Sequence, residues 1–160
     1  MISYKERDMM QRYVQHSKSA LDAIYDVDQR QLVESPSGTK PNGLWFSVGD
    51  GSDWRALFER KGWGLSDVKY WTEIVFSESA NILRAEGAAD IDSLTAAYGK
   101  DDGHAIDWLR IAETFDAIII APHCVERSDH DKTYWYHQWE CSCGCVWQSN
   151  AVKLLRRLNY

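Results

Sequence analysis

The chain has 160 residues and a formal net charge of −6, and its composition, with 44% hydrophobic and 26% charged residues, is that of a globular protein rather than a disordered or fibrous one. A chain of this length forms one well-packed core, so we expect a single domain over residues 1–160. No apolar run approaches the roughly 20 residues that cross a bilayer, and the N-terminus lacks the pattern of a signal peptide, which predicts a cytoplasmic protein with no membrane partner.

Tryptophan is the most unusual part of the composition, with eight Trp beside eight Tyr. Such residues are enriched where proteins hold flat ligands or protein partners, and the alternative is a core rich in Trp. Lys and Arg are concentrated only in the tail at 153–157, which is too short to follow a phosphate backbone. Nonspecific binding to duplex nucleic acid is therefore not expected.

The first half of the chain predicts helix, loop, strand and helix in that order. Apolar residues at loosely helical intervals predict an amphipathic helical segment over 1–24, packed on the core. Residues 25–33 are compatible with a short β-strand. The Gly, Pro, Ser and Asn residues in 34–43 indicate a loop. A short β-type run at 44–48 precedes a helix over 53–58.

The second half predicts more strands, and the most certain is the apolar run at 117–121, which Pro122 ends. Its uninterrupted apolar character places it at the centre of a sheet. The remaining expected elements are a strand at 71–76, an extended or briefly helical stretch at 79–85, helices at 90–98 and 106–115, a polar loop at 126–132, strands at 133–140 and 144–147, and a closing segment at 151–158. Together they predict an α+β fold: one compact domain with a central mixed or antiparallel sheet flanked by helices.

Histidine and cysteine gather in one quarter of the chain, which raises two alternative chemistries. The residues are of the types that bind zinc: His123, Cys124, His130, His137, Cys141, Cys143 and Cys145. Structural zinc sites usually pair ligands as C-x₂-C, whereas these cysteines alternate, so zinc is the less favoured cofactor and reduced thiols are expected. A nucleophilic thiol would need a depressed pKa, and no local feature marks one of these cysteines for it.

Three separated stretches carry a resemblance to a known family. They are 40–47 (Lys-Pro-Asn-Gly-Leu-Trp-Phe-Ser), 115–120 (Phe-Asp-Ala-Ile-Ile-Ile) and 135–140 (Trp-Tyr-His-Gln-Trp-Glu), the last running into Val146-Trp147. Their order over residues 24–157 resembles the mono-ADP-ribosyltransferase fold. It also resembles a group of bacterial and phage proteins with Lys-Pro-x-Gly-Leu-Trp-x-Ser and a Trp-rich C-terminal strand.

The resemblance implies NAD as substrate and assigns a role to each candidate residue. Tyr25 on a first strand would hold NAD, Ser47 would support the nicotinamide side of the pocket, and Glu140 would stabilise the ribosyl cation as nicotinamide departs. The family's glutamate usually stands about four residues before the closing aromatic, where this chain has Cys143. The remaining expected contacts are Lys40 with the pyrophosphate, and Trp45, Trp54, Tyr134 and Tyr136 around nicotinamide or adenine.

Two functions follow as expectations. The first is an NAD-dependent mono-ADP-ribosyltransferase-like protein, encoded by a phage or mobile element and modifying a protein or nucleic-acid acceptor of the host. The alternative is a non-catalytic binding protein that inhibits a host defence or nucleic-acid-binding complex through an acidic, Trp-rich surface, because complementary charge and aromatic residues favour such association.

Overall fold

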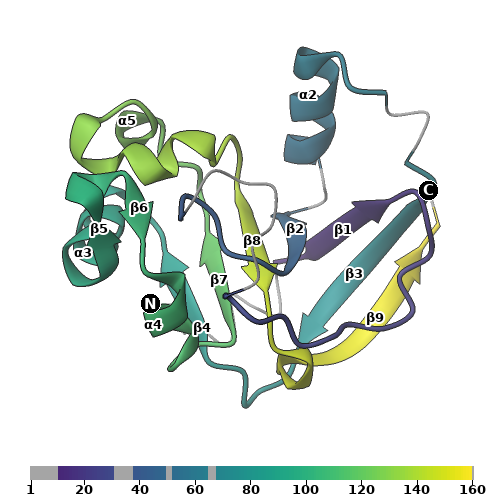
Figure 1. The fold of residues 1–160 in the computed structure, drawn as a ribbon. Helices are drawn as coiled ribbons and strands as arrows, with labels where there is room; N and C mark the ends of the chain where they lie inside the picture. The colour runs from purple at the N-terminus through teal and green to yellow at the C-terminus, as the bar shows by residue number, and fades with distance from the viewer. Residues whose placement is uncertain (1–10, 31–37, 50–51, 65–67, 160) are drawn as a thin grey trace, which may run out of the picture.

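A curled seven-stranded sheet organises the computed structural model, which describes residues 11–30, 38–49, 52–64 and 68–159 (Figure 1). The strands follow the order β4-β7-β8-β2-β1-β3-β9. Their bounds are β1 (Tyr13–Ser17), β2 (Leu44–Val48), β3 (Tyr70–Phe76), β4 (Ile82–Ala85), β7 (Ala117–Ile120), β8 (Cys143–Val146) and β9 (Val152–Leu158). Strands β4 and β7 pair in parallel and the other neighbours pair antiparallel, so the predicted mixed sheet in an α+β fold is confirmed.

Most of the helices lie in two connections, the one between β4 and β7 and the one between β7 and β8. The chain between β4 and β7 holds α3 (Ala88–Tyr98), a small hairpin of β5 (Gly99–Lys100) and β6 (Ala105–Ile106) around the 3₁₀ turn η2 (Asp101–Gly103), and α4 (Trp108–Ala112). This crossover allows β4 and β7 to run parallel. After β7 come α5 (Val125–Ser128) and the 3₁₀ helix η3 (Asp131–Gln138), whereas α2 (Ser52–Lys61) follows β2 and η4 (Ser149–Ala151) precedes β9. Figure 1 shows α3, α4 and α5 gathered beside β4 and β7, with α2 standing apart near β1 and β2.

The two faces of the sheet form two apolar clusters because side chains alternate along each strand. Trp45 and Ser47 oppose Cys145 and Cys143 across β2 and β8, and this face packs against the helices. We call it the helix face. Phe46 and its neighbours point to the opposite face, which forms the second cluster.

Strand β7 is an interior strand, as predicted, but it lies second from the edge of the sheet rather than at its centre. All four of its residues are buried, and it lies between β4 and β8 with both faces covered. Its partner β8 contains Gly144 directly opposite Phe46 of β2, so an aromatic ring lies where another residue would place a side chain. A Cβ at Gly144 would stand 2.5 Å from Phe46 Cζ.

Several sequence predictions about local structure are wrong in the described residues: no strand forms at 25–30, and the loop expected at 126–132 contains α5 and the start of η3. Two further errors concern longer elements. The helix expected over 1–24 is contradicted at 13–17, where β1 pairs with both β2 and β3, and residues 1–10 lie outside the described part. Tyr13 and Val14 are both buried, one on each face of the sheet, because β1 has a neighbouring strand on each side. In the sequence, two consecutive apolar residues fit a helical pattern equally well. The strand expected at 133–140 is the 3₁₀ helix η3, because Trp135, Tyr136 and Trp139 must share one buried side.

The sequence also predicted that no segment crosses a membrane. Within the ranges that the structure describes, no helix is both long and apolar enough to cross a bilayer. The other expected elements agree with the structure more closely. The strands predicted at 44–48, 71–76 and 144–147 and the helices at 90–98 and 106–115 all have observed counterparts, although α4 is shorter than expected.

Candidate functional site

The candidate site is built where β1 lies between β2 and β3. Val14 of β1 opposes Ser47 of β2, and His16 opposes Trp71 of β3, so His16, Ser47 and Trp71 project from the helix face. Helix α2 begins four residues after β2 ends and brings Trp54 against His16. We call the set of His16, Ser47, Trp54, Arg55 and Trp71 the His16 site.

His16 is enclosed by two indole rings. Its ring centroid lies 4.0 Å from that of Trp71 and 5.2 Å from that of Trp54, and only 7% of its surface is exposed. The guanidinium of Arg55 lies 4.9 Å from the Trp71 ring centroid, as in a cation–π contact. The site therefore combines flat aromatic surfaces with one positive charge and one imidazole.

The hydrogen bonds of Ser47 define the tautomer of His16. The Ser47 hydroxyl donates to the carbonyl of Val14 at 3.0 Å, and its oxygen lies 3.4 Å from His16 Nε2. Because the single hydroxyl hydrogen is already used, Ser47 accepts from His16, and Nε2 carries the ring proton. His16 Nδ1 is then a buried acceptor, and it has no hydrogen-bond partner in the structure.

His16 is neutral at physiological pH. Burial, and to a smaller extent the positive charge of Arg55, lowers the pKa of His16 from 6.5 to about 4. A buried polar atom without a partner costs free energy, so such atoms are rare in folded proteins and often mark sites that a ligand completes. The lone pair of Nδ1 is thus without a hydrogen-bond donor inside the site.

Lys40 and Trp45 extend the helix face along β2. Trp45 shares this face with Ser47, and Lys40 Nζ lies 5.2 Å from the Trp45 ring centroid. Trp45 also meets Trp139 edge-on, with ring centroids 4.9 Å apart. Four predicted ligand-binding residues, Lys40, Trp45, Ser47 and Trp54, are therefore brought to one face of the sheet.

The predicted catalytic residue Glu140 lies beside α2 but away from its first turn. Glu140 precedes β8 by three residues, and its carboxylate pairs with Lys61 Nζ at 2.5 Å with 34% of the side chain exposed. Lys61 is the last residue of α2, whereas Trp54 stands in its first turn. At about 1.5 Å of rise per residue, roughly 10 Å of helix separates Trp54 from Lys61.

The three predicted tyrosines are not brought to this site. Tyr25 lies in an irregular stretch with 78% of its surface exposed, so it is not on a first strand. Tyr134 is half exposed on η3, between the rings of His104 at 5.0 Å and His137 at 5.6 Å. Tyr136 is fully buried, its hydroxyl accepts the backbone N–H of Cys124 at 3.0 Å, and burial raises its pKa.

Sequence reasoning missed His16, Arg55 and Trp71. The alternation in Tyr13-Val14-Gln15-His16-Ser17 was the available signal, but five residues are too few to separate strand from helix periodicity. The contact of His16 with Trp71 joins segments more than 50 residues apart, and no local pattern predicts it.

The four cysteines are buried thiols. All four are free and buried, as expected of reduced thiols. A hydrogen bond with Cys141 and burial raise the pKa of Cys143, and burial raises that of Cys145 although Lys40 opposes it. Among the residues that the structure describes, no group of three or more His, Cys, Asp or Glu side chains is arranged to hold a metal ion.

A separate hollow of about 430 Å³ lies at the carboxyl ends of the parallel strands β4 and β7. Its lining includes Gln11, Val48, Glu86, Ala121, Pro122 and Ser142. Carboxyl ends of parallel strands often hold ligands in open sheets. Glu86 is the one ionisable side chain in this lining, so the hollow does not suit a phosphate-bearing molecule as the His16 site does.

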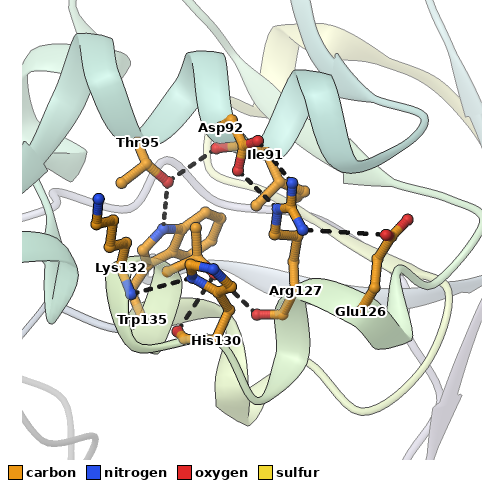
Figure 2. A network of polar contacts seen from close by, with 9 residues as sticks. Ile91, Asp92, Thr95, Glu126, Arg127, His130, Lys132 and Trp135 are labelled. Atoms are coloured by element: carbon orange, nitrogen blue, oxygen red, sulfur yellow. Dashed lines mark hydrogen bonds and ion pairs between the residues drawn. The ribbon is translucent and has the colours of Figure 1, made fainter.

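A polar network on the other side of the molecule fixes the helices that enclose the buried tryptophans (Figure 2). Arg127 of α5 donates to both carboxylate oxygens of Asp92 on α3, at 2.7 and 2.8 Å, and these bonds lower the pKa of Asp92. Trp135 Nε1 donates to Thr95 Oγ1 at 2.8 Å, and the Thr133 hydroxyl donates to the Arg127 carbonyl. We call this network the α3–α5 clamp, and its contacts explain rigidity rather than ligand binding.

Comparisons with known proteins do not assign a function to the chain. No protein-family model, curated protein or solved structure matches the chain.

Proposed function

We propose that the protein binds NAD or a closely related dinucleotide at the His16 site and transfers ADP-ribose from it to a macromolecular acceptor. The observation that carries the proposal is the neutral, buried His16 ring, whose Nδ1 is an acceptor without a partner between two indoles. Nicotinamide is flat and positively charged in NAD, and its carboxamide supplies the N–H donors that this acceptor lacks.

The neighbouring groups suit the rest of the dinucleotide. Indole rings attract a cationic ring by stacking and cation–π contact, which favours nicotinamide at Trp54 and Trp71. Arg55 and Lys40 are the cations beside these rings and would bind the pyrophosphate, Arg55 in bidentate fashion and Lys40 as a point charge. In the mono-ADP-ribosyltransferases that the sequence resembles, a first-strand Tyr, His or Arg holds NAD, and we assign that role to His16 of β1 instead of Tyr25.

The proposed reaction requires one carboxylate. The bond between ribose C1′ and the nicotinamide nitrogen breaks, and both electrons remain with nicotinamide, which leaves as a neutral molecule. The positive charge that develops at C1′ is stabilised by a carboxylate, and an acceptor oxygen or nitrogen then attacks C1′ and loses a proton. We assign the carboxylate to Glu140, which the ion pair with Lys61 holds at the end of α2.

The first test of this function is titration calorimetry of NAD and ADP-ribose into the protein, with nicotinamide release followed by chromatography. His16→Phe keeps an aromatic ring between Trp54 and Trp71 but removes the Nδ1 acceptor, and we expect it to weaken NAD binding at least tenfold. His104→Phe is the matched control, because His104 also stacks on an aromatic ring, that of Tyr134, but lies outside the site. Unchanged affinity in His16→Phe would contradict the assignment of the site.

A Glu140→Gln variant separates binding from transfer. We expect it to bind NAD with wild-type affinity and to lose most nicotinamide release, since the amide does not stabilise a positive charge. Full release by this variant would exclude Glu140 as the catalytic residue. Binding by the wild-type protein without any release would leave a nucleotide-binding protein and remove the transferase activity.

The alternative of a binding protein with a Trp-rich surface receives less support from the side-chain positions. All eight tryptophans lie in the described ranges, and Trp63 is the one that is mostly exposed, at 53%. Trp108, Trp135, Trp139 and Trp147 are buried in the core beside the helices. Half of the tryptophans therefore stabilise the core, and three others are only partly exposed.

A further inference from the structure

Charge is segregated between the two ends of the molecule. Residues 86–132, which include α3, α4 and α5, carry eleven Asp and Glu against four Lys and Arg. The strands β1, β3 and β9 with their immediate flanks, residues 12–18, 69–76 and 152–158, carry six Lys and Arg against one Glu. A protein with a net charge of −6 therefore has a region rich in cations at the end of its sheet where β9 forms the edge, although Asp22 lies 3.9 Å from Arg157 there.

Pairing of the strands concentrates these cations. Glu73 of β3 opposes Arg156 of β9, and its carboxylate lies 3.2 Å from Arg156 and 3.8 Å from Arg12. Only 12% of the Glu73 side chain is exposed, whereas more than half of each arginine side chain reaches solvent. One shielded carboxylate between two exposed guanidiniums leaves a net positive charge.

Two further arginines lie on aromatic rings at the start of β3. The guanidinium of Arg55 lies 4.9 Å from the ring centroid of Trp71, and that of Arg157 lies 5.1 Å from the ring centroid of Tyr70. Tyr70 and Trp71 are consecutive, so they point to opposite faces and the two stacks bracket the end of the strand. Both aromatic side chains are partly exposed.

We propose that this region, the β3–β9 basic surface formed by Arg12, Arg55, Tyr70, Trp71, Arg156 and Arg157, binds single-stranded nucleic acid. Single strands are held by cations that follow the backbone and by aromatic or arginine planes on which bases stack, and this surface offers both. The tail at 153–157 is too short for this alone, but Arg12 beside β1 and Arg55 of α2 add two cations to it. The binding of the strand does not rest on the proposed function, and because Arg55 and Trp71 also belong to the His16 site, NAD and the strand would compete for them.

The test is fluorescence anisotropy of labelled 15-nucleotide oligo-dT and oligo-U, without NAD, at salt concentrations from 50 to 200 mM. Four arginine–phosphate contacts predict a slope of log affinity against log salt of about −3, which is a loss of roughly 50-fold over this range. Arg55→Ala with Arg157→Ala is expected to weaken binding at least tenfold and to reduce the slope. Arg110→Ala is the matched control, because its guanidinium lies 5.2 Å from the Tyr98 ring centroid on the acidic side.

Three outcomes overturn this proposal: no binding at 50 mM salt, an equal loss in Arg110→Ala, or competition by polyglutamate as effective as that by unlabelled oligonucleotide. The last would identify an acidic protein as the partner. Tighter binding to a duplex of the same length would also contradict it, since stacking on Tyr70 and Trp71 requires unpaired bases. The anisotropy measurements contain no NAD, so a failure to release nicotinamide would not affect them. Likewise, a failure to bind the oligonucleotide would not affect the nicotinamide assay.

Discussion

Burial of His16 between two tryptophans makes the stability of the fold depend on pH. The pKa of His16 is about 4 in the folded protein against 6.5 for the free side chain. The unfolded chain therefore takes up the proton first as the pH falls below 6.5, and the stability due to neutral His16 is lost between pH 6.5 and 4. With 1.36 kcal/mol per pKa unit, this loss amounts to about 3 kcal/mol.

Urea unfolding at pH 7, 5.5 and 4.5 measures this dependence. In His16→Phe we expect the free energy of unfolding to change much less between these pH values, because the titrating group is gone. His104→Phe, an exposed replacement, is expected to keep the wild-type dependence. The assignment fails if His16→Phe retains the full loss. The lowered pKa of Asp92 acts below pH 3.8 and lies outside this window.

Gly144 is a second residue on which the fold depends, because the ring of Phe46 occupies the space beside it. The Cβ of an alanine there would lie 2.5 Å from both Phe46 Cζ and the Ile118 carbonyl oxygen. We expect Gly144→Ala to lower the free energy of unfolding by about 2 kcal/mol or more, measured by urea denaturation. Gly87→Ala is the control, since a Cβ there meets nothing within 4 Å, and an equal effect in both variants would refute the steric explanation.

At the scale of elements, the α3–α5 clamp is expected to couple two helices that are distant in sequence. Arg127→Lys and Asp92→Asn remove the two-pronged hydrogen bond, and each is expected to lower the melting temperature only modestly, because Asp92 is half exposed. A double-mutant cycle followed by thermal unfolding gives the coupling energy. Arg30 and Asp28 form the same geometry two residues apart on the surface, and Arg30→Lys should be nearly neutral. Equal effects at both pairs would show that the clamp does not join the helices.

Elements with a strong local signal could be predicted from the sequence. The run Ala117–Ile120 has only apolar residues and is a fully buried interior strand. The signal failed where tertiary contacts decide. Tyr13–Ser17 becomes a strand because two neighbours pair with it, and η3 is helical because its tryptophans must reach one core.

At the scale of the whole molecule, the sequence predicted two of the five residues of the His16 site, Ser47 and Trp54, together with the neighbouring Lys40 and Trp45. Lys40, Trp45 and Ser47 belong to one short segment ending in β2, so local spacing was enough to place them together. His16 and Trp71 reach the same site only through the order β2-β1-β3, which no periodicity encodes. Tyr25 was assigned from the resemblance, and Tyr134 and Tyr136 as aromatic residues, and neither basis specifies which side of the molecule a ring occupies.

The position of β8 also constrains how the chain acquires this shape during synthesis. In the described strand order, β8 is the single link between the pair β4-β7 and the group β2-β1-β3-β9, yet it is formed by residues 143–146. Until those residues leave the ribosome, β2 and β7 each expose an unpaired edge beside apolar surface. The nascent chain is therefore aggregation-prone until its last strands emerge, and chaperones that shield strand edges should raise its yield.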